Sequence, residues 1–387
     1  MTTVLFVSNG HGEAAIAERI AAELRTMDPS GVRDHLPLVG ESASEQMREV
    51  GPRRPMPSGG LIAMGNVRNM LRDLRAGLLS LLAAQRKFLR SVRGSYDAVV
   101  AVGDSYCLTM AQLARAKTIF VGTAKSVSVA PYGAFERRLL SRAQARFVRD
   151  DATARFLREA GLDVEPAANV IVDLFANATD PRACAATDGF DPALALFPGS
   201  RDSAYGDASF LLAVVADVAK KYPKLGAVLS IAPGLDPLRF ADDARRAGWE
   251  LHETGSERIP FVLSMQGRSV VRAWTGKLGA VLERVKLVLG QAGTANEGAA
   301  AAGVPVVAFA RERDGGSQWY RRRQQGLLKG ALAVLPGELS QAVAGVVELL
   351  NDPDRRREMS ETGRARMGGP GGARRIAMRI LSLASES

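Results

Sequence analysis

The chain has 387 residues, of which 47% are apolar and 24% charged, and its formal net charge at pH 7 is +10. A single hydrophobic core stops growing at roughly 250–300 residues, so this length predicts two globular domains, and the composition argues against a disordered chain. The presence of only two cysteines and three histidines argues against a disulfide framework or a metal site and fits a reducing cytosol.

The N-terminal residues predict a first β-strand over 4–7. They lack the basic start of a signal peptide and turn polar after a short apolar run. No run of 18 or more apolar residues occurs in the sequence, which argues against a membrane-spanning helix. We therefore expect a cytoplasmic protein that remains on one side of any membrane it touches.

A glycine-containing turn follows this strand, and a helical pattern begins at once. The turn comprises Asn9, Gly10, His11, Gly12 and Glu13. Glycines let a ligand approach the backbone closely, and a helix N-terminus offers N–H groups to an anion. We expect one edge of a substrate site here, although a tight turn with a solvent-facing histidine is the alternative. The dinucleotide fingerprint is excluded, because its third glycine is missing.

A strongly basic segment comes next, with nine Lys/Arg and one acidic residue over 53–93. Residues 66–93 predict one or two amphipathic helices, with arginines beside an apolar side formed by Leu71, Leu74, Leu78, Leu81, Leu82 and Phe88. Such a helix can lie on an anionic membrane surface. The alternative is a helix that packs on the core with solvated arginines. Aromatic residues do not interleave with the arginines, so we expect no nucleic acid partner.

Short apolar runs alternate with helix-length stretches along the whole chain, a pattern typical of βαβ units and parallel sheets. The expected strands are 4–7, 98–102, 118–121, 145–148 and 170–172, then 194–197, 227–231, 261–263, 286–289 and 305–309. The polar stretch 176–191 predicts a linker near Asp188, which gives domains 1–188 and 189–387. The last helix, Ala373–Ala384, can cross back to the first domain.

Two turns of the second domain carry chemistry suited to a nucleotide. After strand 194–197 come Gly199, Ser200 and Arg201, which supply a close approach, a hydroxyl and a charged fork that fits a diphosphate. After strand 286–289 come Gly293 and Thr294, and Glu297 lies one helical turn later, where it can accept hydrogen bonds from ribose hydroxyls. The alternatives are a loop-capping arginine and a glutamate that stabilises its own helix.

Together, the sequences SNGHGE, LFPGSR and GTANEGAAAAGVPVV resemble the lipid-A-disaccharide-synthase-related branch of the GT-B glycosyltransferases. The resemblance implies an α/β fold of the GT-B type, in which two Rossmann-like doubly wound domains face each other across a cleft. It implies acceptor binding by the first domain through Asn9, Gly10, Gly12 and Glu13. It also implies a donor pocket in the second domain formed by Gly199, Ser200, Arg201, Gly293, Thr294, Asn296, Glu297 and Gln318.

The resemblance also points to Asp104 as the catalytic base, because this residue follows the strand 98–102 in a Gly-Asp sequence. An aspartate at the end of a strand can take the proton from an acceptor hydroxyl. His11 is the competing base, since an unperturbed histidine titrates nearer neutral pH.

The expected function is transfer of a sugar from a UDP-sugar to a lipid acceptor at the inner face of the cytoplasmic membrane, without metal or cofactor. Two alternatives stay open. One is a UDP-sugar epimerase of the same fold, because a nucleotide-sugar pocket does not require an external acceptor. The other is a noncatalytic protein that binds a nucleotide sugar or a lipid. The donor sugar, the acceptor and the oligomeric state do not follow from the sequence.

Overall fold

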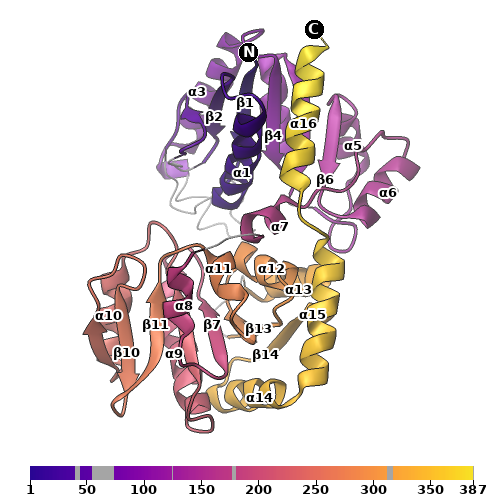
Figure 1. The fold of residues 1–387 in the computed structure, drawn as a ribbon. Helices are drawn as coiled ribbons and strands as arrows, with labels where there is room; N and C mark the ends of the chain where they lie inside the picture. The colour runs from indigo at the N-terminus through magenta and orange to yellow at the C-terminus, as the bar shows by residue number, and fades with distance from the viewer. Residues whose placement is uncertain (40–43, 55–73, 124, 177–179, 312–316, 387) are drawn as a thin grey trace. The chain divides into compact units, whose positions relative to one another are not determined.

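The computed structural model describes residues 1–387 except 40–43, 55–73, 124, 177–179, 312–316 and 387. The chain divides into two compact units, which are coloured by residue number in Figure 1. Unit 1 comprises Met1–Leu174 and Gly369–Ser387, and unit 2 comprises Phe175–Gly368.

Unit 1 is built on a six-stranded parallel sheet with the order β3-β2-β1-β4-β5-β6. The central strands β1 and β4 are almost continuously buried and consist mainly of apolar residues, as expected for a parallel sheet covered on both faces. The elements are β1 Thr3–Ser8, α1 His11–Met27, β2 Val32–Pro37, β3 Arg48–Glu49, α3 Leu78–Ser91, β4 Ala98–Gly103, α4 Ser105–Ala111, β5 Lys117–Gly122, α5 Ala134–Leu140, β6 Ala145–Val148, α6 Asp151–Glu159, α7 Val170–Phe175 and α16 Gly372–Ser385.

Unit 2 contains an eight-stranded sheet with the order β14-β13-β12-β7-β8-β11-β10-β9. The strands from β14 to β11 are parallel, and β10 and β9 extend one edge in antiparallel fashion. The elements are α8 Arg182–Thr187, β7 Ala193–Phe197, α9 Ser203–Ala219, β8 Gly226–Ser230, α10 Pro237–Arg246, β9 Glu250–Glu253, β10 Phe261–Met265, β11 Arg268–Trp274, α11 Leu278–Leu282, β12 Leu287–Gly290, α12 Thr294–Ala301, β13 Val306–Ala310, α13 Ser317–Leu328, β14 Leu332–Pro336, α14 Leu339–Asn351 and α15 Pro353–Met367.

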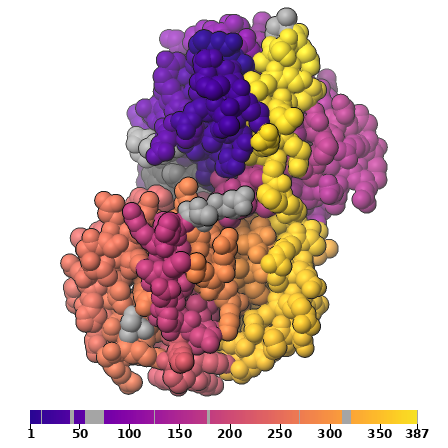
Figure 2. All heavy atoms as spheres, in the orientation of Figure 1, coloured from indigo at the N-terminus to yellow at the C-terminus, as the bar shows by residue number. Residues whose placement is uncertain are grey.

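The C-terminal helix α16 belongs to unit 1, where it packs along α1 (Figures 1 and 2). Asp173 fixes its start, because the carboxylate accepts hydrogen bonds from the backbone N–H groups of Gly371 and Ala373 at 2.5 and 2.8 Å. Glu165 pairs with Arg379 further along the helix, at 2.9 Å. A capped start and an apolar face thus hold the last helix on the first sheet.

Two expectations from the sequence differ from the structure. Residues 170–172, expected as a strand, form the start of helix α7, because the run is only three residues long and continues into Asp173 and two further apolar residues. The stretch 176–191, expected as a linker, contains helix α8. This helix packs against β8 and β11, so the division into units falls after Leu174 rather than near Asp188.

The described part of the basic segment supports the alternative in which its helix packs on the core. Within α3, Leu78, Leu81 and Leu89 are buried, and Phe88 packs against the core of unit 1. Leu74, from the predicted apolar side, and Leu79 are exceptions, with 37% and 68% of their surfaces exposed. Leu71 lies outside the described residues. Every helix in the described part of the chain is too short or too polar to cross a membrane.

Many arginines of the described chain are used internally, which accounts for part of the positive charge. Arg146 donates to the carbonyl oxygens of Leu140 and Asp163, and Arg356 donates to those that end helix α14. Arginines suit this task because their rigid fork donates several hydrogen bonds and stays charged. A high net charge therefore does not require an anionic partner here.

Candidate functional site

The two predicted donor turns meet at one point of the unit 2 sheet. Strands β7 and β12 are parallel neighbours, with Phe197 opposite Gly290 at their carboxyl ends. From β7 the chain crosses through α9 to β8, and from β12 it crosses through α12 to β13 on the other side. The strand order reverses between them, and ligands of open α/β sheets bind in the crevice at such a switch point.

The turn after β7 is open around its glycine. Gly199 has φ +121°, a conformation that side-chain-bearing residues rarely adopt, and a Cβ atom built on it would meet no atom within 4 Å. Ser200 and Arg201 follow and are exposed. The turn thus offers exposed backbone beside a hydroxyl and a guanidinium group.

Two further arginines, which the sequence did not single out as site residues, flank helix α9 just after this turn. Arg239 lies 3.8 Å from the ring centre of Tyr205 and 3.6 Å from the carboxylate of Asp202. Arg311, at the end of β13, pairs with Asp207 at 2.7 Å and lies over the ring of Phe210. Each guanidinium is held by a ring and a carboxylate, which restricts its position. Only the sheet order reveals that both belong to this edge.

The turn after β12 is fastened directly to β7. The N–H groups of Gln291 and Ala292 both donate to the carbonyl oxygen of Phe197, at 2.8 and 3.2 Å. Helix α12 then begins, with Gly293 as its N-cap and Thr294 as its first residue. Both are partly exposed, as is Glu297 in the first turn, so these predicted donor residues lie at the surface beside the carboxyl end of β12.

The structure gives Asn296 an interior position. Its side chain is fully buried, and its amide donates to the carbonyl oxygen of Gly290 at 3.1 Å and to Gln324 Oε1 at 3.3 Å. A side chain with no exposed surface does not contact a ligand directly, which differs from the expected donor contact. Gln318 lies in α13, but its side chain is outside the described residues.

Unit 1 has an equivalent switch point between β1 and β4, where Ser8 pairs with Val102. Its glycines are closely surrounded by the chain's own side chains. A Cβ on Gly10 would lie 2.6 Å from Glu13 Oε2, and one on Gly103 would lie 2.7 Å from Asn9 Oδ1. Asn9 and Glu13, predicted as acceptor contacts, thus occupy the space that these glycines leave. Gly12 is the second residue of α1 and is partly exposed.

Asp104, the predicted base, is the N-cap of helix α4. Its Oδ1 atom accepts a hydrogen bond from the backbone N–H of Cys107 at 3.0 Å. This cap uses one carboxylate oxygen, and an aspartate can cap a helix and still exchange a proton at the other oxygen. His11 is the first residue of α1, and its side chain is outside the described residues. Burial raises the pKa of the neighbouring Cys107 thiol, so it is no ready nucleophile.

A polar cluster that the sequence did not indicate adjoins Asp104. Glu136 accepts hydrogen bonds from Ser105 Oγ at 2.8 Å, from Lys125 Nζ at 2.6 Å and from the Gly133 N–H at 2.9 Å. Burial raises the pKa of Glu136, but these three donors outweigh burial and the net shift is downward. The cluster therefore keeps a carboxylate charged at the carboxyl edge of the first sheet.

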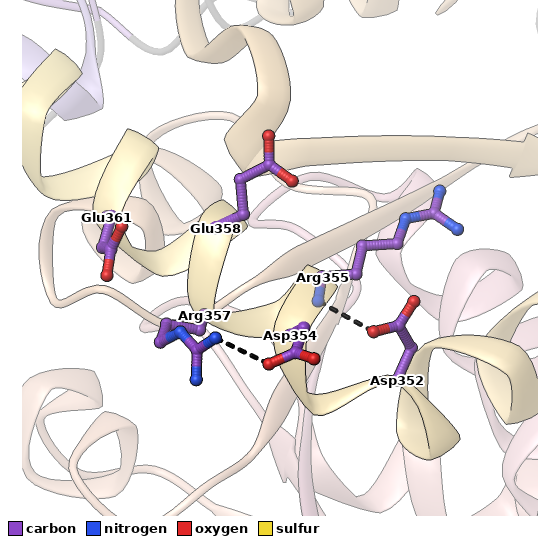
Figure 3. A pocket seen from close by; sticks show the side chains of 6 residues that line it. All are labelled: Asp352, Asp354, Arg355, Arg357, Glu358 and Glu361. Atoms are coloured by element: carbon purple, nitrogen blue, oxygen red, sulfur yellow. Dashed lines mark hydrogen bonds and ion pairs between the residues drawn. The ribbon is translucent and has the colours of Figure 1, made fainter.

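An open hollow lies elsewhere in unit 2, on the surface of α15 (Figure 3). It is lined by Asp352, Asp354, Arg355, Arg357, Glu358 and Glu361. Asp354 pairs with Arg357 at 2.6 Å, and Asp352 caps the helix. The lining consists entirely of charged side chains of both signs, so the hollow has the character of a solvated helix surface. Among the described residues, no group of three His, Cys, Asp or Glu side chains could hold a metal ion.

A scan against protein-family models finds no match, and a search of curated proteins finds none either. Solved structures do match. A UDP-N-acetylglucosamine 2-epimerase superposes with a TM-score of 0.59 at 13% identity, covering 100% of this chain and 97% of the other. The UDP-GlcNAc 2-epimerase of Neisseria meningitidis bound to UDP-GlcNAc gives 0.56 at 14% identity, covering 100% of both chains.

A glycosyltransferase matches equally well. The spinosyn rhamnosyltransferase SpnG, complexed with thymidine diphosphate, superposes with a TM-score of 0.56 at 16% identity and covers 98% of this chain and 100% of its own. At such identities the matches show the fold alone, and they give no support to the finer resemblance to lipid-A-disaccharide synthases. The chain has the GT-B fold, with two α/β domains built on largely parallel sheets.

Proposed function

We propose that this protein is an enzyme that binds a UDP-sugar at the β7–β12 switch point of unit 2 and epimerises it. One observation carries the proposal. Two turns predicted independently as phosphate and ribose contacts lie side by side, joined by hydrogen bonds to Phe197, at the point of the sheet where open α/β folds bind ligands.

Each contact has a distinct chemical task. Arg201 and the N–H groups that begin α12 would hold the diphosphate, because a guanidinium fork and a helix N-terminus both favour anions. Glu297 would accept hydrogen bonds from the ribose hydroxyls. Ser200 and Thr294 can donate through their hydroxyl groups. Asp104 and His11 are the candidates for the group that moves a proton.

Epimerisation is favoured over transfer because UDP-GlcNAc 2-epimerases recur among the structures that match over the whole chain. An epimerase inverts one carbon of the bound sugar and needs no acceptor. Glycosyl transfer is the second candidate, supported by the rhamnosyltransferase match and by the sequence resemblance. A lipid acceptor has no support of its own, because the apolar side of α3 largely packs on the core.

The binding half of the proposal is tested by calorimetry with a panel of UDP-sugars. We expect Arg201→Ala and Glu297→Ala each to weaken binding by about tenfold or more, since each removes a hydrogen-bonding charge. Arg245→Ala is the matched control, an exposed arginine on α10 that pairs with Asp242. Unchanged binding in both site variants would show that the pocket is wrongly placed.

The reaction half is tested with the UDP-sugar alone. Proton NMR should show conversion of one UDP-sugar into its epimer without any added acceptor. A product that forms only after addition of a lipid extract would replace the epimerase reading by glycosyl transfer. Tight UDP-sugar binding without any product, under both conditions, would indicate the noncatalytic alternative.

A further inference from the structure

Gln324, on helix α13, is a buried residue to which the proposed function gives no task. Its side chain is 4% exposed. Its amide nitrogen donates to the carbonyl oxygens of Ala292 and Gly293, at 3.2 and 3.1 Å, and its oxygen accepts from Asn296 Nδ2 at 3.3 Å. All three partners belong to the turn after β12 or to the start of α12.

The orientation of both amides follows from their partners. If the Gln324 amide were flipped, its oxygen would face two carbonyl oxygens and its nitrogen would face another donor. Asn296 is fixed in the same way, because its nitrogen faces the carbonyl oxygen of Gly290. A Cβ on Gly290 would collide with Asn296 Oδ1, so the glycine makes room for this amide.

The two amides determine where the turn directs its N–H groups. In a trans peptide the carbonyl and the N–H point in opposite directions. Gln324 draws the carbonyls of Ala292 and Gly293 toward itself, so the N–H groups of Gly293 and Thr294 point to the opposite side. The preceding N–H groups, of Gln291 and Ala292, are used on Phe197. Gly293 and Thr294 are therefore the donors that the turn presents.

We propose that Gln324 is a positioning residue, which with Asn296 holds the turn after β12 so that the N–H groups of Gly293 and Thr294 receive a phosphate of the nucleotide. The inference rests on the proposed function, because it names how that site is organised. The Gly293 carbonyl also accepts from the Glu297 N–H at 3.2 Å. Gln324 thereby fixes the first turn of α12, which carries Glu297.

The test uses the full chain with the variant Gln324→Leu, and Gln85→Leu as the matched control. Gln85 is a fully buried glutamine of unit 1 that likewise donates to two carbonyl oxygens, of Leu38 and Pro52, at 2.9 and 3.1 Å. Both variants should lose similar stability. Only Gln324→Leu should weaken UDP binding, by about tenfold or more, because only it releases phosphate donors.

Two readouts separate positioning from general damage. In Gln324→Leu, affinity for uridine, which lacks the phosphates but keeps the ribose that Glu297 would contact, should fall by a smaller factor than affinity for UDP. In Gln324→Glu a carboxylate would face the carbonyls of Ala292 and Gly293, so UDP binding should fall. It should recover, relative to the unmodified protein at the same pH, as acid protonates Glu at this position and restores one donor.

Hydrogen exchange distinguishes failure of this inference from failure of the proposed function. In the ligand-free protein, Gln324→Leu should speed exchange over 291–298, while Gln85→Leu should not. Unchanged exchange, or undiminished UDP affinity in a protein that binds UDP, would overturn the positioning role. Faster exchange in a protein that does not bind UDP at all would uphold the positioning of the turn and refute the proposed function.

Discussion

Both units place a glycine turn after the central strand of a doubly wound sheet, yet the surroundings of these glycines differ. In unit 2, the space beside Gly199 is open to at least 4 Å, and exposed Arg201 stands next to it. In unit 1, Gly10 and Gly103 are closed off by the side chains of Glu13 and Asn9. The same type of turn thus leaves open space beside the glycine in unit 2, whereas the chain's own side chains fill that space in unit 1.

The charges at the two edges differ as well. Unit 2 collects Arg201, Arg239 and Arg311 around the start of α9, which suits an anion. Unit 1 gathers the carboxylates of Asp104 and Glu136. Glu136 is kept charged by Lys125, so Asp104 is the carboxylate to which the proposed function gives proton transfer, whereas an arginine edge is suited to holding phosphate. Under the proposed function, nucleotide binding would fall to unit 2 and proton transfer to unit 1.

The largest expected effect is a loss of turnover on substitution of Asp104, and its absence would contradict the comparison. Asp104→Asn keeps a side chain that caps α4 equally well but cannot take a proton, so turnover should fall by about a hundredfold or more while stability changes little. Asp104→Ala should lose the cap in addition, at a cost of about 1 kcal/mol in the free energy of unfolding. Both are measured by turnover of the UDP-sugar and by urea unfolding.

Full activity in Asp104→Asn would show that Asp104 only caps α4. His11 would then be the remaining candidate for the group that transfers a proton. His11→Asn is then the informative variant, because it retains a polar side chain at the start of α1 and removes the titrating ring. Activity in both single variants would remove proton transfer from these turns altogether.

The sequence predicted the fold well wherever strands were continuous apolar runs. The buried strands β1, β4, β7 and β12 were found for this reason. Strand β2 was missed because Arg33, Asp34 and His35 interrupt its apolar pattern, although the last two are buried through specific partners. Asp34 is satisfied by Arg48 and Tyr96, which are distant in sequence. Periodicity cannot reveal such pairing.

For the site, the sequence predicted the glycine turns, but it did not predict what fills the space beside each glycine. A motif indicates that the backbone can be approached, but whether Glu13 or a ligand fills the space depends on the folded chain. Asn296 belongs to the donor motif and proved to be interior, while Gln324, which holds the same turn, lies 28 residues further along. Its proposed role follows only from the folded structure, in which a hydrogen bond joins Gln324 on α13 to Asn296 on α12.

The pH dependence of stability tests unit 1 through His35, a buried histidine beside the glycine turn that follows β1. His35 is fully buried on β2, and its Nε2 lies 2.9 Å from Oγ of Ser8, the residue before the turn. Burial, and then the charge of Arg53, lowers the pKa of His35 to about 4. The unfolded chain therefore binds the proton more readily, and stability should fall by roughly 1–3 kcal/mol as the pH drops from about 7 to about 4.

This loss should begin in unit 1. All three tryptophans of the chain, Trp249, Trp274 and Trp319, lie in unit 2, and its single histidine, His252, is exposed. Amide exchange over β1 and β2 should accordingly rise at a higher pH than the one at which tryptophan fluorescence changes. His35→Gln should flatten the pH dependence of exchange in unit 1. A simultaneous acid transition in both units, unaltered by that variant, would contradict the assignment.

The smallest expected effect, and the most direct test of the open turn, is at Gly199. Gly199→Ala forces a side chain into φ +121°, and Gly248→Ala does the same at φ +88° after α10, also with no atom within 4 Å. Each should cost about 1 kcal/mol or more in the free energy of unfolding. Only Gly199→Ala should also weaken UDP binding, by about tenfold, because the methyl group would occupy space that the diphosphate needs. Equal UDP affinity in the two variants would mean that the opening beside Gly199 is filled by water alone, and the contrast between the two units would lose its functional meaning.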